Sequence, residues 1–365
     1  MTSHASILLV KLRHHGDVLL TTPVARALKA VFPNCQVDIL VYEGMEALVK
    51  NNPDLRHVWS WNRTIRGWRG LWSHVQLFKQ LRRQHYHVVL HLSEQMQGAL
   101  LARFLAPLQA IGIDYPKRRN FFWRSCFTDL IPLFPSDTRH TVEQHLAALE
   151  PLGIKAVGDQ ARCRLLVDEK DRHAMQQRLA EAGIAKPYIL IHPTARWFFK
   201  CWEDDRFATV IQSLAAEGWP IVLTSSPEAD EMQMITSILN QVTAPDVLSL
   251  AGQVTLGELA ALIEGARLFV GVDSVPMHMA AALQKDTVAL FGPSKIKEWH
   301  PWMTRSEVIR ASDYGPLLDP DAVITNTRER YLSNIPVTAV MEAIQKMLSR
   351  SEKEVHEKEN DSLSH

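Results

Sequence analysis

The chain has 365 residues, of which 46% are hydrophobic and 22% charged, and its 40 Lys and Arg residues balance its 40 Asp and Glu residues. This length predicts two domains rather than one core, and the composition excludes a disordered or membrane-spanning protein. The neutral total hides an asymmetry, because residues 1–167 carry 21 Lys and Arg against 12 Asp and Glu while the remainder has the opposite excess.

The first half alternates short apolar runs with helical periods. Strands are predicted at 6–10, 37–42, 87–92 and 109–113. Helices are predicted around Val24–Val31, over about 68–83 and over about 139–151. Between the first strand and the first helix, KLRHHGDVLL (11–20) gathers five ionisable groups where a turn requires only its glycine.

Two stretches of this half mix basic and aromatic residues. No acidic residue occurs between Asp54 and Glu94, and residues 115–127 repeat the mixture as YPKRRNFFWRSCF. Such stretches form either an ordinary solvated face or a surface for an acidic partner, which here means a phosphorylated ligand or an anionic membrane. Nucleic acid is not expected, because the total charge is neutral and the second half is acidic.

The second half repeats the alternation. Strands are predicted at 188–192, 220–224, 246–250, 267–272 and 287–291. Helices are predicted near 203–217, 228–241, 255–265, 276–284 and 336–349. Near-continuous apolar strands alternating with helices predict the α/β class, with two Rossmann-like, doubly wound parallel sheets facing a central cleft.

The expected domains span residues 1–165 and 166–335. The helix at 336–349 is expected to pack back on the first domain, and the polar tail at 350–365 is expected to be disordered. The four cysteines lie far apart and form no CxxC pair. This pattern favours reduced thiols in the cytosol.

Ligands of doubly wound sheets bind beyond the carboxyl ends of the strands, so the polar residues that follow each strand are the candidate site. In the first half these are Asp17, directly after Gly16, and Glu94. Asp17 is either a functional carboxylate or a residue of the first helical turn that complements the helix dipole.

In the second half, Thr194 and Lys200 follow one strand, which suits a phosphate or an ordinary loop with an exposed lysine. Asp273 and Ser274 follow another, and the helix that begins there could receive a pyrophosphate. The chain has no GxGxxG, no GxxxxGK[ST] and no zinc-ligand spacing, and its one DxD (319–321) is interpreted as a turn. A reaction without metal is therefore expected.

Several stretches resemble a known family when taken together and in order. They are KLRHHGDVLLTTP (11–23), IHPTARWFFKCW (191–202), LAGQVTLGELAALI (250–263), GVDSVPMHMAAAL (271–283) and ALFGPS (289–294). The chain resembles glycosyltransferase family 9, the ADP-heptose:lipopolysaccharide heptosyltransferases, and within it the core heptosyltransferase III branch. The resemblance implies a GT-B fold and inverting transfer from ADP-heptose to the lipopolysaccharide inner core, with no metal or other cofactor. It also implies a cytoplasmic enzyme, peripheral on the anionic inner membrane.

The resemblance also implies roles for single residues. The catalytic aspartate falls on Asp17. Donor contacts fall on or beside Thr194, Lys200, Glu228, Asp273, Ser274 and His278. On the basic first domain, acceptor contacts are expected from Lys11, Arg13, His14, His15, Glu94, Arg118 and Arg119.

Two departures from the family pattern stand out. The basic residues at 13–15 occupy positions where small hydroxyl residues are common, which indicates an acceptor richer in negative charge. Val275 stands where glycine is common, at the closest approach to the pyrophosphate. The alternatives are a transferase for another ADP-sugar, a nucleotide-sugar epimerase, or a binding module on the same fold. An epimerase would need no surface rich in Trp and Arg.

Overall fold

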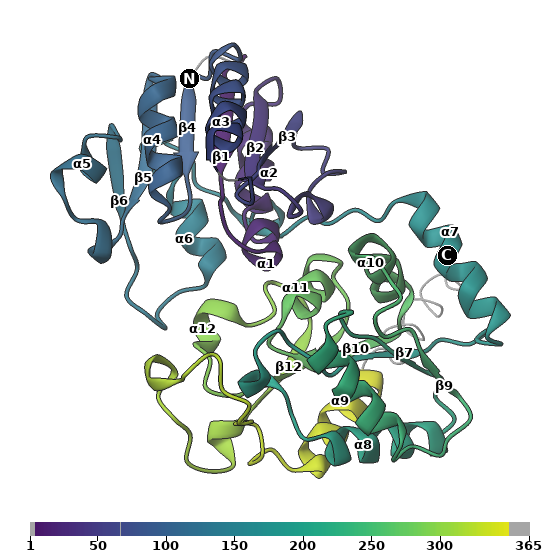
Figure 1. The fold of residues 1–365 in the computed structure, drawn as a ribbon. Coiled ribbons are helices and arrows are strands. Elements are labelled where there is room, and N and C mark those ends of the chain that lie inside the picture. Colours follow the sequence, from purple (N-terminus) through teal and green to yellow (C-terminus); the bar gives the residue numbers. More distant parts are fainter. Residues whose placement is uncertain (1–3, 66, 350–365) are drawn as a thin grey trace, which may run out of the picture. The chain divides into compact units, whose positions relative to one another are not determined.

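The computed structural model describes residues 4–65 and 67–349 (Figure 1). The chain divides into two compact units between Leu166 and Val167. The tail at 350–365, which was predicted to be disordered, lies outside the described residues. No helix within the described ranges is long and apolar enough to cross a membrane.

The first unit is built on a six-stranded sheet in the order β3-β2-β1-β4-β5-β6, and all of its pairings are parallel. Its strands are β1 (Ser6–Val10), β2 (Gln36–Tyr42), β3 (His57–Trp61), β4 (Val88–His91), β5 (Gln109–Asp114) and β6 (Asp129–Pro132). The four predicted strands are confirmed, whereas the two edge strands, β3 and β6, were not predicted. The order reverses between β1 and β4, which makes this pair the topological switch point.

Helices cover both faces of this sheet, which explains why β1 is buried throughout. They are α1 (His15–Leu19), α2 (Thr22–Val31), α3 (Gly67–Arg82), α4 (Met96–Leu105), α5 (Phe121–Arg124) and α6 (Thr141–Ala147). Alternate residues of a strand point to opposite faces. Ile7 and Leu9 accordingly pack with residues of α2 and α6, and Leu8 and Val10 pack with residues of α3 and α4.

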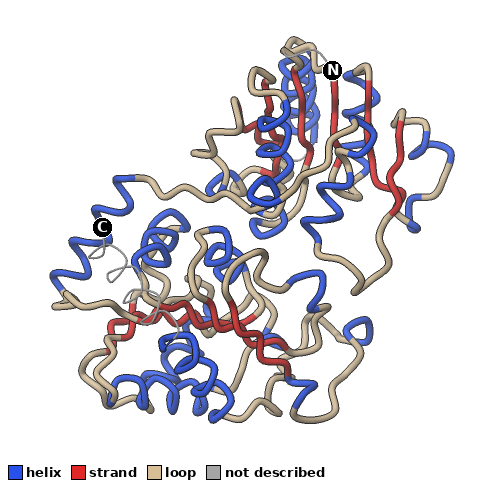
Figure 2. Tube along the Cα trace, turned by 180° about the vertical axis from the view of Figure 1, so that it is seen from behind, coloured by secondary structure: helices blue, strands red, loops and turns tan. Residues whose placement is uncertain are grey.

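The second unit repeats this topology in the order β12-β11-β10-β7-β8-β9, again parallel throughout. Its strands are β7 (Ile189–His192), β8 (Ile221–Leu223), β9 (Val247–Ser249), β10 (Leu268–Val272), β11 (Thr287–Phe291) and β12 (Ser306–Arg310). Figure 2 shows helices on both sides of this sheet. The switch point lies between β7 and β10. The prediction of two doubly wound parallel sheets is confirmed.

The helices of this unit begin at residues typical of helix starts. They are α7 (Glu169–Glu181), α8 (Asp204–Ala216), α9 (Ala229–Leu239), α10 (Leu256–Gly265), α11 (Val275–Ala282), α12 (Ile296–Trp299) and a last helix over 337–349. The side chain of Thr255 accepts from the backbone of Glu258 in a capping box at the start of α10. In α11, Pro276 occupies the first turn, where its missing N–H costs no intrahelical bond.

The last helix packs within the second unit. Val340, Ile344 and Met347 are fully buried in the core around β10 and β11, and Arg267 donates to the carbonyl of Leu348 at 2.9 Å. The prediction that this helix packs on the first domain is therefore wrong. The reason is that Ile335, just before the helix, is already buried in the second core, which takes up the apolar face of the helix.

Candidate functional site

Each unit gathers part of its predicted site residues at its own switch point, whereas Arg118 and Arg119 follow β5 and Glu228 follows β8. In the first unit, the loops after β1 and β4 carry Lys11 to Asp17 and Ser93 to Glu94. In the second, the loops after β7 and β10 carry Lys200 and Asp273. The carboxyl ends of neighbouring parallel strands share one sheet edge, so these residues come together within each unit.

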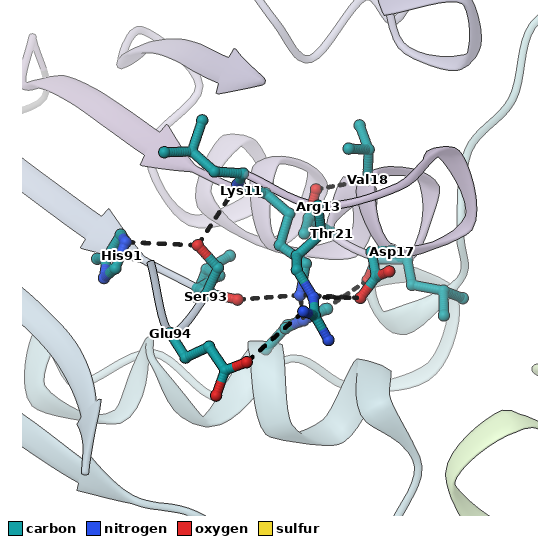
Figure 3. A network of polar contacts seen from close by, with 12 residues as sticks. Lys11, Arg13, Asp17, Val18, Thr21, His91, Ser93 and Glu94 are labelled. Carbon is teal, nitrogen blue, oxygen red and sulfur yellow. Dashed lines mark hydrogen bonds and ion pairs between the residues drawn. The ribbon is translucent and has the colours of Figure 1, made fainter. Parts of the chain in front are cut away.

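Asp17 lies in the first turn of α1 with two cations beside it. Its Oδ1 is 3.6 Å from Nζ of Lys11 and 3.9 Å from Nε of Arg13. Figure 3 shows Arg13 between two carboxylates, because its Nη1 is also 3.6 Å from Oε1 of Glu94. The side chain of Asp17 remains 17% exposed, so a small group can reach it. The contacts therefore join Lys11, Arg13, Asp17 and Glu94 into one cluster.

Lys11 is nearly fully buried beneath this cluster. Its Nζ donates to the carbonyl of Leu92 at 2.9 Å and lies 2.8 Å from Nε2 of His145, which α6 contributes. Burial lowers the pKa of Lys11, and the charge of Asp17 acts in the opposite direction. His145 was not predicted as a site residue, because nothing in the sequence links it to Lys11, 134 positions away.

The other predicted acceptor residues divide between this cluster and separate contacts. Arg118 joins it, because its Nε donates to the carbonyl of Glu94 at 3.0 Å. His14 is the N-cap residue of α1. His15 turns to another loop, where its Nε2 lies 2.8 Å from the carbonyl of Gly44. Arg119 pairs with Asp114 at 3.1 Å.

The second switch point holds a close ion pair. Nζ of Lys200 lies 2.5 Å from Oδ2 of Asp273, whose side chain is only 4% exposed. Burial alone would raise the pKa of Asp273, but the charge and hydrogen bond of Lys200, together with His278 and Ser294, outweigh it, so the pKa is lowered. Lys200 also lies over the ring of Trp197, with its Nζ 5.1 Å from the ring centroid. The ammonium group is thus held at the strand ends, with its side chain 15% exposed.

Thr194 faces the interior. Its hydroxyl donates to Oε2 of Glu231 at 2.5 Å, and the same carboxylate oxygen accepts from the backbone N–H of Ser226 at 3.1 Å. Glu231 therefore ties the loop after β7 to the loop after β8. It was not predicted, because a glutamate in the first turn of a helix has an ordinary explanation in the helix dipole.

Glu228, Ser274 and His278 all lie at helix starts. Glu228 is the exposed N-cap residue of α9, and its side chain makes no capping bond. Ser274 is the N-cap residue of α11, but its hydroxyl donates to the carbonyl of Val272, so it does not cap the helix either. His278, in α11, is buried. The N–H groups that begin an uncapped helix suit an anion.

The two clusters offer complementary chemistry. The first combines a partly exposed carboxylate with cations, which suits proton removal from a hydroxyl group. The second combines a fixed ammonium with a helix start, which suits a phosphate. Across residues 4–65 and 67–349, no three His, Cys, Asp or Glu side chains gather in a way that could hold a metal ion.

Comparisons with known proteins find a matching family and similar proteins for this chain. Residues 74–328 match the profile of glycosyltransferase family 9 (heptosyltransferase). Lipopolysaccharide heptosyltransferase 3 of Escherichia coli is 36% identical over 341 residues, which cover 93% of this chain and 98% of that protein.

Solved structures share the fold. The family 9 glycosyl transferase from Veillonella parvula superposes with a TM-score of 0.81 at 21% identity, covering 96% of this chain and 99% of that chain. E. coli heptosyltransferase WaaC with ADP gives a TM-score of 0.72 at 19% identity, covering 94% of this chain and 99% of that chain. The predicted GT-B architecture is confirmed by these matches.

Proposed function

The chain belongs to glycosyltransferase family 9, and on that basis we propose that it transfers a heptose from ADP-L-glycero-D-manno-heptose to a heptose of the lipopolysaccharide inner core. One observation carries the proposal. The three residues with the most specific family roles, Asp17, Lys200 and Asp273, lie at the switch points of their sheets, where doubly wound folds bind ligands.

We assign the donor to the second unit. The pyrophosphate of ADP-heptose approaches Lys200 and the start of α11, while Glu228, exposed at the start of α9, contacts the ribose. The bond between the anomeric carbon and the β-phosphate oxygen breaks with its electron pair on the oxygen. The ammonium of Lys200 and the helix N–H groups stabilise the negative charge that develops there.

We assign the acceptor to the first unit. Asp17 takes the proton of the attacking hydroxyl while that oxygen bonds to the anomeric carbon, and attack opposite the leaving ADP inverts the configuration. Arg13 lies beside this carboxylate and Arg118 bonds the backbone of Glu94, and their positive charge suits an acceptor that carries anionic groups.

The test is ADP release from ADP-heptose with and without lipopolysaccharide of truncated core. Release that requires the acceptor, with a heptose gained by the acceptor, supports the proposal. Release without acceptor indicates hydrolysis or epimerisation, binding without release indicates a binding module, and faster release from another ADP-sugar indicates a different donor. A parallel reaction with EDTA tests the metal-free mechanism, which loss of activity would overturn.

We further propose that the enzyme is cytoplasmic and docks on the anionic cytoplasmic face of the inner membrane through the layer formed by α3, α4 and α5. None of these helices contains an acidic residue. Phe78 of α3 contacts Phe104 of α4, with ring centroids 5.4 Å apart, and Trp123 of α5 packs with Ala99 of α4. The three helices therefore cover the same face of the sheet.

Large apolar side chains are exposed on α3 and α5, among them Trp68 (75%), Leu71 (67%), Trp72 (58%) and Phe121 (88%), and Leu108 (79%) is exposed in the loop after α4. Exposed cations accompany them on the helices at Lys79, Arg82, Arg103 and Arg124, and in the adjoining segments at Arg83, just after α3, and Lys117, before α5. Aromatic side chains that enter the headgroup region, together with cations that attract anionic lipid, are the usual features of a peripheral membrane surface.

Changing Arg83, Arg103 and Lys117 together to Gln is expected to weaken binding to phosphatidylglycerol-containing vesicles by at least tenfold, because each cation near such a surface contributes about 1 kcal/mol. Changing Lys170, Lys186 and Arg310 to Gln removes the same charge from exposed sites of the second unit and serves as the control. Both variants are expected to keep wild-type ADP affinity. Equal vesicle binding by the two variants would indicate that α3, α4 and α5 form an ordinary solvated surface that does not bind the membrane.

A further inference from the structure

The ammonium group of Lys11 is held by two neutral acceptors inside the first unit. It donates to the carbonyl of Leu92 at 2.9 Å and lies 2.8 Å from Nε2 of His145, and its third neighbour is Oδ1 of Asp17 at 3.6 Å. Lys11 is 4% exposed and His145 is 2% exposed, so water has little access to either side chain. Two N–H groups of the ammonium thus have an acceptor at hydrogen-bond distance, and Asp17 supplies a charge just beyond it.

The neighbours of His145 determine where its ring carries hydrogen. Nδ1 lies 2.9 Å from the carbonyl of Leu20, which can only accept, so Nδ1 carries the hydrogen. Nε2 faces an ammonium, which can only donate, so Nε2 presents its lone pair. Burial, with the charge of Lys11, lowers the pKa of His145 well below its ordinary value. The ring is therefore a neutral acceptor toward Lys11.

His145 also braces the helix that carries Asp17. Leu20, whose carbonyl accepts from the ring, is the C-cap residue of α1. Lys11 lies just before α1 in the chain, so one imidazole from α6 contacts the backbone at the end of α1 and the cation that precedes the helix. The position of Asp17 relative to Lys11 is thus fixed through His145.

We infer that His145 is a positioning residue for the transfer reaction, holding the Lys11 ammonium beside Asp17 without letting it close on the carboxylate. The inference rests on the proposed function, in which Asp17 takes the proton of the acceptor. The observed 3.6 Å is longer than the roughly 2.7–2.9 Å of a charge-assisted N–H···O bond. At this distance the cation orients the carboxylate but leaves its oxygen available to the acceptor hydroxyl.

The test compares His145→Leu, which removes the acceptor, with His145→Gln, whose amide oxygen can take the place of Nε2. Without the acceptor, Lys11 can bond Asp17 directly, and kcat is expected to fall at least ~10-fold, since a displacement of about 1 Å in a catalytic group can cost 10²-fold. The KM for ADP-heptose, which binds the other unit, is expected to stay within about twofold. Gln is expected to restore kcat to within about threefold of wild type.

A double-mutant cycle separates this role from simple support of the fold. In a Lys11→Met background, His145→Leu is expected to lower kcat no further, because the residue it positions is gone. Two results would overturn the inference. One is that the losses in kcat caused by Lys11→Met and His145→Leu multiply in the double variant. The other is that His145→Gln has a kcat no higher than that of His145→Leu. If His145→Leu does not fold, the same cycle is run with Gln against Asn, whose shorter side chain withdraws the acceptor from Lys11.

Failure of this inference can be told from failure of the proposed function. An active wild type, an inactive Asp17→Asn variant and a fully active His145→Leu variant would overturn only the role of His145. A wild type without acceptor-dependent transfer, or an Asp17→Asn variant with normal turnover, would overturn the function on which the inference rests.

Discussion

Replacing Asp17 with Asn is expected to lower turnover by at least ~10² while ADP affinity and the melting temperature stay near wild type. Asn keeps the shape of the side chain and most of its hydrogen bonding, but it cannot accept the proton of the acceptor hydroxyl. In the variant, the buried ammonium of Lys11 keeps two hydrogen-bond acceptors, the carbonyl of Leu92 and Nε2 of His145. Steady-state ADP release at saturating acceptor measures the effect.

A matched control is Asp54→Asn in the same unit. Asp54 is also a largely buried carboxylate in an ion pair, with 11% of its side chain exposed and Arg164 at 3.1 Å. It does not belong to the cluster around Asp17. Its replacement is expected to lower the melting temperature and to leave turnover unchanged, which is the reverse of the Asp17 result.

The rival bases in this stretch are the two histidines, since imidazole titrates in the working pH range. His15 is a poor candidate, because its Nε2 lies 2.8 Å from a backbone carbonyl and so carries the hydrogen. Burial also lowers the pKa of His15, which makes its ring a weaker base. His14→Gln and His15→Gln are therefore expected to be milder than Asp17→Asn. An Asp17→Asn enzyme with near-normal turnover would leave Asp17 as a residue of the first helical turn that complements the dipole.

The sequence predicted the strands whose two faces are covered by helices, and of the four edge strands it predicted only β9. β1, β4, β7, β10 and β11 are buried along their whole length and mostly apolar, because helices pack on each side of their sheets. The edge strands β3, β6 and β12 are only partly buried, and they contain polar residues or a proline. β3 lies in the basic and aromatic stretch. Its composition favoured a surface, and the alternation of apolar and polar residues that is typical of a strand was not recognised there.

The site was predictable to the extent that it follows strand ends. Asp17, Lys200 and Asp273 could be placed from the sequence, because a polar residue after a buried parallel strand lies at the ligand edge. His145 and Glu231 could not, since each acts through a partner on another element, respectively 134 and 37 positions away. Such contacts depend on how the loops fold over the sheet, which local periodicity does not encode.

Lys200→Met is expected to weaken ADP binding by about 10- to 100-fold, because a hydrogen bond to a charged group contributes about 1.5–3 kcal/mol. Met keeps much of the length and the apolar stem of lysine, so the loop after β7 retains its packing. Isothermal calorimetry with ADP measures the loss. Lys200→Arg keeps the positive charge and is expected to retain more of the affinity than Met.

The same change is expected to destabilise the second unit in a pH-dependent way. In the wild type, the lowered pKa of Asp273 contributes stability that is present above the unfolded pKa and lost as pH falls through the folded pKa. Without Lys200, the pKa of Asp273 is expected to rise, because only His278 and Ser294 then oppose the effect of burial, and a buried carboxylate that has lost its main partner opposes folding at neutral pH. The deficit in unfolding free energy relative to wild type is therefore expected to be largest near neutral pH and to shrink on acidification, as urea denaturation at several pH values can measure.

The double variant Lys200→Met/Asp273→Asn separates the two roles of the lysine. Asn removes the buried negative charge, so the melting temperature is expected to recover much of what Lys200→Met lost. ADP affinity is expected to stay low, because a neutral amide supplies no cation to the pyrophosphate. Recovery of both properties would mean that Lys200 affects ADP only by keeping the strand ends folded. Wild-type ADP affinity in Lys200→Met itself would show that the pyrophosphate binds without this ammonium, leaving the start of α11 as its principal contact.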